Sequence, residues 1–207
     1  MHQPFTIRDA QPADHADFVR LFAELKTGDR RADSERWVAD VMPDTFFLEE
    51  DGRKVAYAYV MLLGELGYVC HVVVDAPARG RGVGRALMRV IADRLREKRC
   101  TRWELNVKPD NLPAVRLYES VGMHKQYEST VVRIDWDDAL RLPLESGVAV
   151  HEIDPSEDDE IERNLHLAEG KILRLREMTG QLLVQLVDEA GVRRGFARFD
   201  PDFPGAA

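Results

Sequence analysis

Residues 72–88 are Val72-Val73-Val74-Asp75-Ala76-Pro77-Ala78-Arg79-Gly80-Arg81-Gly82-Val83-Gly84-Arg85-Ala86-Leu87-Met88. Three β-branched residues in succession are typical of a buried strand. Three glycines at alternate positions follow, and glycine lets the backbone adopt positive φ and approach a ligand closely. Apolar residues four apart then predict one face of an amphipathic helix: Val83, Leu87, Ile91 and Leu95. The stretch therefore predicts a strand, a glycine-rich turn and a helix.

The predicted turn has the chemistry of an anion site. The first amides of a helix have no partner inside the helix, and the helix start carries a partial positive charge. Arginines interleaved with the glycines add full charges suited to phosphate. We therefore expect the turn to cradle a pyrophosphate group. The alternative is a tight strand-to-helix connection whose arginines are only solvated.

Two common phosphate-binding motifs do not fit this turn. A P-loop needs Lys and then Ser or Thr after its last glycine, where this chain has Arg85-Ala86. A dinucleotide fingerprint needs Gly-x-Gly-x-x-Gly, and Gly84 comes one residue too early. That fingerprint also needs an acidic residue about 20 positions further on, at a strand tip. Glu104 has this spacing but lies inside a predicted strand.

Composition limits the class of protein. The chain has 207 residues, 44% hydrophobic and 32% charged, which is ordinary for a globular protein with a buried core. No apolar run approaches the roughly 18 residues of a membrane span, and the first residues lack a signal-peptide pattern. The net charge of −8 disfavours nucleic acid as a partner. Cys70 and Cys100 have no metal-ligand spacing and are expected to be reduced, which agrees with a cytoplasmic protein.

Acidic residues are unevenly distributed along the chain. Residues 145–207 hold 14 Asp or Glu and 7 Lys or Arg, whereas the remaining residues hold 23 and 22. Pro143 and Gly147 flank the change in composition. We therefore predict two domains, residues 1–144 and residues 145–207.

The first domain alternates strand and helix patterns in the order β-α-α-β-β-β-α-β-α-β-β, which predicts a mixed α/β sheet with one parallel crossover. The strands are expected at 5–8, 45–48, 54–63, 68–74 and 102–107, and the helices at 18–25, after 34, at 83–98 and at 112–120. Residues 123–127 and 130–136 are expected to form a closing strand pair.

A second motif follows the glycine-rich turn. It is Asn111-x-x-Ala114-x-x-Leu117-Tyr118-x-x-x-Gly122-Met123. Together with Arg79-x-x-Gly82-x-Gly84, it resembles the signatures of the GNAT superfamily of N-acetyltransferases, with Met where the family usually has Phe. The resemblance covers about residues 5–137. It implies an α+β fold: a mostly antiparallel sheet with a central splayed parallel pair, flanked by helices.

The resemblance also implies acetyl-CoA as the acyl donor and no metal. The pantetheine arm would pair with backbone groups of Val72, Val73 and Val74. A strand amide near Val73 or Val74 would also stabilise the oxyanion of the tetrahedral intermediate. Asn111 would contact CoA, cap a helix, or do both. The pyrophosphate would be held by Arg79, Gly80, Arg81, Gly82, Val83, Gly84 and Arg85.

Candidate acid and base residues carry the reaction in this interpretation. Tyr118 is the candidate general acid that protonates the departing CoA thiolate, and its alternative role is core packing. Many relatives have a carboxylate on the strand before the loop, where this chain has Cys70 and His71. His71 has a suitable ordinary pKa near 6.5, although a half-buried histidine bonded to backbone is an equal alternative. Glu65, Glu104 or a chain of waters remain open as the base.

The tail has a β-α-β-β pattern of its own. A strand is expected at 148–151, one helix from Ser156 to about Met178, and a hairpin of 181–187 and 192–199. This order resembles the first half of a GNAT domain without its phosphate loop. At about 60 residues it cannot easily bury its own apolar face. We expect it to pack on the first domain or on a second copy of the chain, giving a homodimer; an unrelated appendage is the alternative.

Three functions remain open at this point. The first is an N-acetyltransferase that acts on a small-molecule or protein amine. The second is a CoA-binding regulatory module without catalysis, and the third is a nucleotide-binding protein. The sequence does not identify the acceptor amine.

Overall fold

The computed structural model describes residues 5–27, 31–130, 136–143 and 147–200. The chain divides into two compact units, residues 1–125 and residues 126–207. The boundary expected between residues 144 and 145 falls among residues outside the described ones and remains a prediction. Each unit is described by itself.

A five-stranded sheet forms the centre of the first unit. Its order is β1-β2-β3-β4-β5, and every neighbouring pair is antiparallel except the parallel pair of β4 and β5. The mixed, mostly antiparallel sheet with one parallel pair is therefore confirmed. The strands are β1 (Thr6–Asp9), β2 (Thr45–Glu50), β3 (Arg53–Leu63), β4 (Leu66–Val74) and β5 (Arg102–Leu105).

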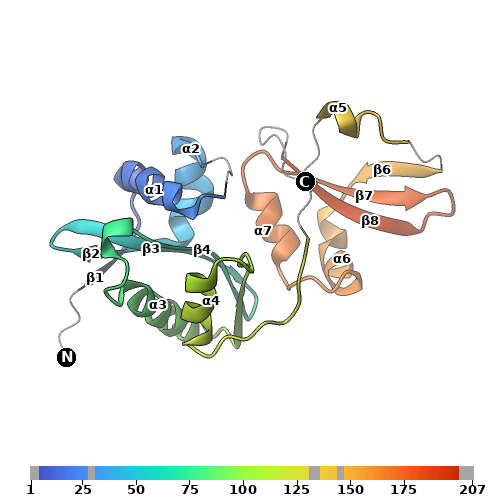
Figure 1. Ribbon diagram of the computed structural model, residues 1–207. Coiled ribbons are helices and arrows are strands. Elements are labelled where there is room, and N and C mark those ends of the chain that lie inside the picture. The colour runs from blue at the N-terminus through green and yellow to red at the C-terminus, as the bar shows by residue number, and fades with distance from the viewer. Residues whose placement is uncertain (1–4, 28–30, 131–135, 144–146, 201–207) are drawn as a thin grey trace. The chain divides into compact units, whose positions relative to one another are not determined.

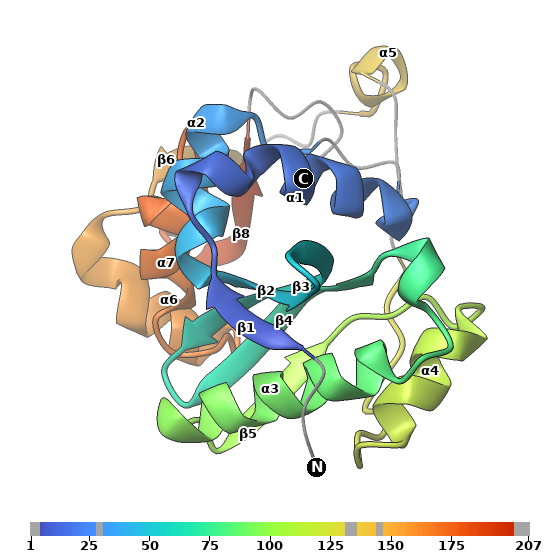
Figure 2. The ribbon, with the colours of Figure 1, turned by 90° about the vertical axis from the view of Figure 1, so that its left-hand side faces the viewer.

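Helices cover both faces of this sheet. The helices α1 (His15–Phe22) and α2 (Ser34–Arg36) lie over one face, and α3 (Val83–Glu97) and α4 (Leu112–Glu119) lie over the other (Figures 1 and 2). A π-helical turn, Trp37–Val41, continues α2. The predicted strand–turn–helix order around the glycines is confirmed.

Each face of the sheet has its own core. Aliphatic side chains fill the core on the α3 face. Burial of one Leu or Ile side chain there stabilises the fold by about 1.5–3 kcal/mol. The buried residues of this core include Leu48, Ala56, Ala58, Val69, Leu87, Met88 and Ile91. Aromatic rings fill the α1 face, and the rings of Phe18 and Trp37 stack 4.7 Å apart. The other rings of this cluster are His15, Phe22, Phe47, Tyr57, Tyr59 and His71.

The first strand of the expected closing pair, residues 123–127, is not found in the described structure. Residues 123–130 form no strand and are mostly exposed, so they have no apolar face to hold them against a sheet. Residues 131–135 lie outside the described part of the chain. Trp136, expected at the end of the second strand, begins the short helix α5 (Trp136–Ala139).

The second unit contains an antiparallel three-stranded sheet and, besides α5, two further α-helices among its described residues. The strands β6 (Val148–Glu152), β7 (Leu182–Asp188) and β8 (Arg193–Phe199) pair in that order. The expected single helix from Ser156 to Met178 is wrong, because the chain forms α6 (Asp158–Asn164) and α7 (Lys171–Glu177). The core of the unit consists of Ile153, Ile161, Ile172, Leu175 and Leu183.

The break between α6 and α7 has a local cause. His166 and Gly170 both have positive φ, of 53° and 75°, which no continuous helix accommodates. The buried carboxylate of Glu162 accepts the amides of Gly170 and Ile172 at 2.8 and 2.7 Å. An acceptor at the start of α7 satisfies amides that the helix leaves unpaired. The turn lets Ile161 and Ile172 enter the same core.

Cys70 and Cys100 form no disulfide with each other in the described structure. None of the helices in the described ranges is long and apolar enough to cross a membrane.

Candidate functional site

The site is shaped by a β-bulge in β4. Tyr59 of β3 is opposite His71, but the next residue, Val60, is opposite Val69. Cys70 is therefore the extra residue of the bulge. A bulge bends the strand and re-aims its side chains. Here it follows directly on the last residue of β4 that pairs with β5.

Beyond this bulge the parallel pair parts. β5 pairs only with Leu66–Val69 and ends at Leu105, whereas β4 continues to Val74. Among the described residues, no strand pairs with residues 70–74 on that side. The sheet therefore has the opening that the resemblance implied, next to the strand that leads into the glycine-rich loop.

Backbone direction selects which residues face this opening. Asp75 donates its amide to the Val55 carbonyl of β3 at 2.8 Å. Because alternate residues of a strand turn their backbone groups to opposite sides, Val73 also faces β3. The amides of Val72 and Val74 face the opening. Val72 and Val74, rather than Val73, are thus the residues whose backbone an extended ligand could reach there.

The glycine-rich loop presents free amides at the start of α3. Gly80 and Gly82 have φ of 73° and 84°, a conformation that favours glycine, and Gly82 is the N-cap of α3. Within the described structure, no hydrogen bond uses the amides of residues 80–85. The Arg79 amide, also expected to be free, donates to the Ala76 carbonyl at 3.2 Å. Six amides at a helix start fit an anion such as pyrophosphate.

The third glycine of the loop serves packing instead. A Cβ atom on Gly84 would lie 3.1 Å from Cδ2 of Leu117 on α4. Gly84 thus allows the first turn of α3 to approach α4 closely. This contact links the loop to the helix that carries Tyr118.

Two of the three loop arginines already have carboxylate partners. Arg79 pairs with Glu24 at 2.8 Å and donates from Nε to the Val74 carbonyl at 3.1 Å. Arg81 forms a two-pronged pair with Glu50 at 2.6 and 3.0 Å. No single motif joins these residues in the sequence, so the two glutamates could not be found from it.

Arg85 differs from the other two arginines. Its side chain is exposed and forms no ion pair with any described residue. The sequence predicted three phosphate-binding cations in the loop. The structure leaves Arg85 as the loop arginine whose charge is not already matched by a carboxylate.

Tyr118 packs in the core and keeps a hydroxyl that can donate. The ring lies against the core of the α3 face, and its hydroxyl has no hydrogen bond to any described residue. Burial raises the pKa of the Tyr118 phenol above its ordinary value of 10.0. The phenol therefore stays protonated at neutral pH. The two roles considered for Tyr118, core residue and proton donor, are compatible.

Asn111 is the N-cap of α4. Its Oδ1 accepts the amide of Ala114 at 3.4 Å, which confirms the capping role. A contact with CoA stays a prediction.

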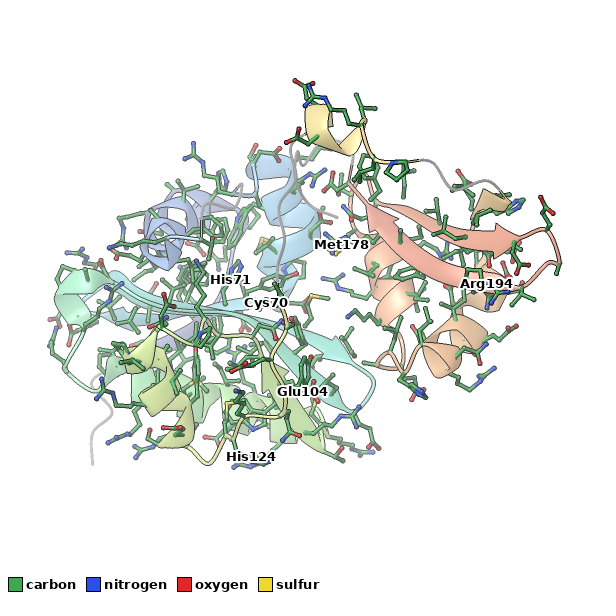
Figure 3. The ribbon with its side chains drawn as sticks, turned by 45° about the vertical axis from the view of Figure 1, so that its right-hand side comes forward. Cys70, His71, Glu104, His124, Met178 and Arg194 are labelled. Atoms are coloured by element: carbon green, nitrogen blue, oxygen red, sulfur yellow. The ribbon has the colours of Figure 1, made fainter. Side chains whose placement is uncertain are left out.

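His71 lies on the α1 face of β4, among aromatic rings (Figure 3). Its Nδ1 lies 3.1 Å from the Tyr57 hydroxyl. The rings of Phe22 and Tyr59 meet it edge-on at 5.5 and 5.4 Å. Tyr57 lies in the strand expected at 54–63, but the sequence gives no signal that its hydroxyl reaches His71.

The carboxylate candidates lie at different distances from the opening. Glu104 is on β5, directly opposite Tyr68, with its side chain exposed (Figure 3). Trp103 and Leu105 pack on the α3 face, so Glu104 is on the same face as His71. Asn106, just beyond β5, donates to the Tyr68 hydroxyl at 2.9 Å across the two strands.

Glu65 lies away from the opening. It sits in the turn between β3 and β4, where its carboxylate accepts the Thr101 hydroxyl at 3.1 Å. Five residues of strand, about 16 Å, separate it from Cys70. The structure therefore brings His71 and Glu104 to the opening and does not bring Glu65. In the described part of the chain, no three His, Cys, Asp or Glu side chains gather as a metal site.

Comparison with known proteins gives the family. The family described as Acetyltransferase (GNAT) matches residues 11–123, more than half of the chain. The chain belongs to the GNAT family of acetyltransferases. The matched residues include the β4 bulge, the glycine-rich loop and Tyr118.

Similar proteins with known names are acetyltransferases. Mycothiol acetyltransferase of Acidothermus cellulolyticus is 38% identical over 97 residues, 39% of this chain and 30% of that protein. The ribosomal protein bS18-alanine N-acetyltransferase of Escherichia coli K12 is 30% identical over 88 residues, 42% of this chain and 57% of that protein. This chain thus spans only part of either relative.

A solved structure shares the fold. The ribosomal-protein-alanine N-acetyltransferase of Brucella melitensis biovar Abortus 2308 superposes with a TM-score of 0.53 at 24% identity. The match covers 63% of this chain and 99% of that chain.

Proposed function

We propose that the chain is an acetyl-CoA-dependent N-acetyltransferase that transfers the acetyl group directly to a primary amine. The observation that carries this proposal is the parting of β4 and β5 directly before a loop with six free amides. An extended arm ending in a pyrophosphate needs both features, an open strand edge and an anion site. Family membership supports the same donor.

The donor would bind along the end of β4. Backbone groups of Val72 and Val74 would pair with the pantetheine arm as a further strand would. The amides of residues 80–85, with the charge of Arg85, would hold the pyrophosphate. This arrangement uses no metal.

The reaction is a direct transfer. The neutral amine attacks the thioester carbonyl, and a strand amide of Val72 or Val74 stabilises the oxyanion of the tetrahedral intermediate. The carbon–sulfur bond then breaks, and the Tyr118 hydroxyl gives its proton to the thiolate. The attacking nitrogen loses one proton as the amide forms, and an equivalent proton from solvent restores the Tyr118 hydroxyl. A phenol with a raised pKa is a weak acid, so placement beside the sulfur decides its effectiveness.

We assign removal of the proton from the acceptor ammonium to a residue on the α1 face of the sheet. His71 and Glu104 are the two sequence candidates that lie on this face near the opening. Glu65, in the turn before β4, is too far from the opening to remove this proton. Water remains as a carrier of the proton in either case.

The acceptor is a primary amine of a small molecule or a protein. The named relatives act on one of each kind, mycothiol and a ribosomal protein alanine. We also propose that residues 145–207 are a degenerate half of a second GNAT domain, because β6, α6, α7, β7 and β8 follow the same β-α-α-β-β order that opens the first unit. The absence of a disulfide between Cys70 and Cys100 fits a cytoplasmic enzyme.

A screen of amines tests the proposal. Small amines, amino acids and peptides with free N-termini are each incubated with the protein and acetyl-CoA, and released thiol is measured. Thermal unfolding with acetyl-CoA, ATP or NAD is measured in parallel. We expect acetyl-CoA alone to raise the unfolding temperature, and at least one amine to release thiol. Stabilisation by ATP or NAD instead would refute the donor site, and binding without turnover of any amine would favour a non-catalytic CoA-binding module.

A further inference from the structure

The aromatic cluster on the α1 face contains a hydrogen-bonded pair, Tyr57 and His71, of which the proposed reaction uses only His71, as a candidate base. Tyr57 of β3 is 0% exposed, and its hydroxyl lies 3.1 Å from Nδ1 of His71. Among the residues that the structure describes, this is the only hydrogen bond of the Tyr57 hydroxyl. The centroids of the Phe18 and Phe47 rings lie 5.6 and 5.9 Å from that of the Tyr57 ring, and neither ring offers an acceptor atom.

The direction of this hydrogen bond follows from burial. Burial raises the pKa of Tyr57 well above its ordinary value of 10.0, so the group is a phenol with one O–H to donate. If Nδ1 of His71 carried a proton and donated it, the buried O–H would have no acceptor. A buried donor without a partner is rarer and more costly than an acceptor with a spare lone pair. The Tyr57 hydroxyl therefore donates to Nδ1.

We propose that Tyr57 fixes His71 in the tautomer with its proton on Nε2, so that His71 acts on the acceptor side as a hydrogen-bond donor and not as the general base. The inference rests on the proposed function for its catalytic meaning. A neutral imidazole has one donor and one acceptor nitrogen, and Tyr57 occupies the acceptor. Nε2, which points away from the Tyr57 hydroxyl, then carries N–H.

Protonation of this histidine would disturb the buried pair. A doubly protonated ring would have to donate from Nδ1 to the Tyr57 oxygen, which turns the phenol proton toward apolar neighbours. Tyr57 is thus a positioning residue that acts through His71. In this proposal the Nε2–H donates to an oxygen of the acceptor, and removal of the amine proton falls to Glu104 or to water.

The tautomer is measured directly by NMR on the intact protein labelled with ¹⁵N in histidine. Protonated and unprotonated ring nitrogens have well-separated ¹⁵N shifts, and the His71 signals are identified by their loss in His71→Gln. We expect Nε2 protonated and Nδ1 unprotonated at a pH where the ring is neutral. The opposite pattern in the wild-type protein would overturn the inference, whether or not the protein acetylates anything.

A matched pair of variants assigns the tautomer to Tyr57. Tyr57→Phe removes the donor, and we expect His71 to become a mixture of both tautomers. Tyr59→Phe is the control, because its ring also contacts His71 at 5.4 Å while its hydroxyl donates to the Asp40 carbonyl at 3.3 Å. The control should leave the His71 shifts in place. A mixture in Tyr59→Phe alone, or no change in Tyr57→Phe, would contradict the role of Tyr57.

Kinetics with an acceptor from the amine screen show whether His71 acts as a hydrogen-bond donor or as the general base. His71→Gln places an amide N–H near the position of Nε2, whereas His71→Ala removes it. Loss of a hydrogen-bond donor should lower kcat/KM about three- to tenfold in the Ala variant, and Gln should recover part of it. Equal losses of about 10²–10⁴ in both variants would instead identify His71 as the base and refute the inference.

Discussion

At the scale of single residues, the two kinds of glycine in the loop illustrate how one residue type serves two purposes. Gly84 is needed for space, since a Cβ atom there would press on Leu117. Gly82 is needed for conformation, since a Cβ atom there would meet nothing within 4 Å although φ is 84°. The space beside Gly82 is where an anion bound to the loop amides would have to lie.

Substitution of Gly82 therefore tests the donor site. Asp and Asn both tolerate positive φ and both can cap a helix, so the fold should survive either change. Gly82→Asp adds a negative charge beside the pyrophosphate and should weaken acetyl-CoA binding by at least about 100-fold. Gly82→Asn is the isosteric control and should bind within about tenfold of the wild type. Isothermal titration calorimetry measures both, and equal affinities would show that no phosphate lies at this loop.

Tyr118 gives a second prediction at this scale, with a pH dependence. Tyr118→Phe should lower kcat roughly 10- to 100-fold while acetyl-CoA affinity changes little, because only proton transfer is lost. Since burial raises the pKa of the phenol, the active protonated form persists through neutral pH and is lost only above about pH 10.

The alkaline decline of kcat that this predicts should be absent in Tyr118→Phe. A pH–rate profile of both proteins measures it. Unchanged turnover in the variant would remove Tyr118 from the mechanism and leave it as a core residue.

At the scale of elements, a buried carboxylate joins three parts of the first unit. Asp14, just before α1, accepts Arg8 of β1 at 2.8 and 3.0 Å and the Gln11 amide at 2.7 Å. Lys54 of β3 lies 3.2 Å from it. Desolvation raises the pKa of Asp14, but the hydrogen bonds from Arg8, Gln11 and Lys54 outweigh it and hold the pKa below its ordinary 3.8.

The sign of this shift predicts how stability depends on pH. A carboxyl with a lowered pKa stabilises the folded state fully above its ordinary value, and this contribution is lost as pH falls through the folded-state pKa. Asp14→Asn should therefore cost about 2–4 kcal/mol of unfolding free energy at pH 7, and the cost should shrink only as pH falls below 3.8 and through the lowered pKa of the folded state. Urea unfolding at several pH values measures the difference.

An exposed pair provides the control for Asp14. Asp93 pairs with Arg96 at 2.7 Å, three residues apart on α3, with both side chains largely exposed. Surface pairs of this kind contribute little, so Asp93→Asn should leave stability unchanged at every pH. A pH-independent cost of Asp14→Asn would mean that packing, and not the charge, accounts for the effect.

Elements with a strong local signal were predictable, and elements decided by distant contacts were not. The strand, glycine turn and helix of residues 72–88 carry their own periodicity and turn residues, and so does the cap at Asn111. The apolar spacing between Ile161 and Leu175 suited one helix, but burial of both Ile161 and Ile172 in one core required a reversal at Gly170. For residues 123–127, the β pattern had no apolar face to bury.

The candidate site divides in the same way. Motif residues of the loop and α4 were located by spacing, because the motif is local in sequence. The residues that contact the site could not be located from the sequence. Glu24, Glu50 and Tyr57 lie 55, 31 and 14 residues along the chain from their partners Arg79, Arg81 and His71. The bulge at Cys70 likewise depends on the register between β3 and β4, which one strand alone does not reveal.

At the scale of the whole molecule, the two units differ in what they contribute to the proposed reaction. Every residue assigned to the donor lies before residue 126, and the first unit has its own core around Leu87, Met88 and Ile91. The second unit has a separate core around Ile161 and Ile172, and its sheet lacks a glycine-rich loop. Donor binding should thus be a property of residues 1–125.

A shortened chain ending at residue 125 tests this division. It should remain folded and bind acetyl-CoA within about threefold of the full chain, because the open edge of β4 and the loop amides are intact. Bound ligand at 100 times its Kd should stabilise both proteins equally, by about 2.7 kcal/mol. Circular dichroism confirms the fold, and Gly82→Asp in the short chain shows that binding uses the same loop. A folded short chain without affinity for acetyl-CoA would mean that residues after 125 complete the donor site, and that the second unit is part of the catalytic machinery.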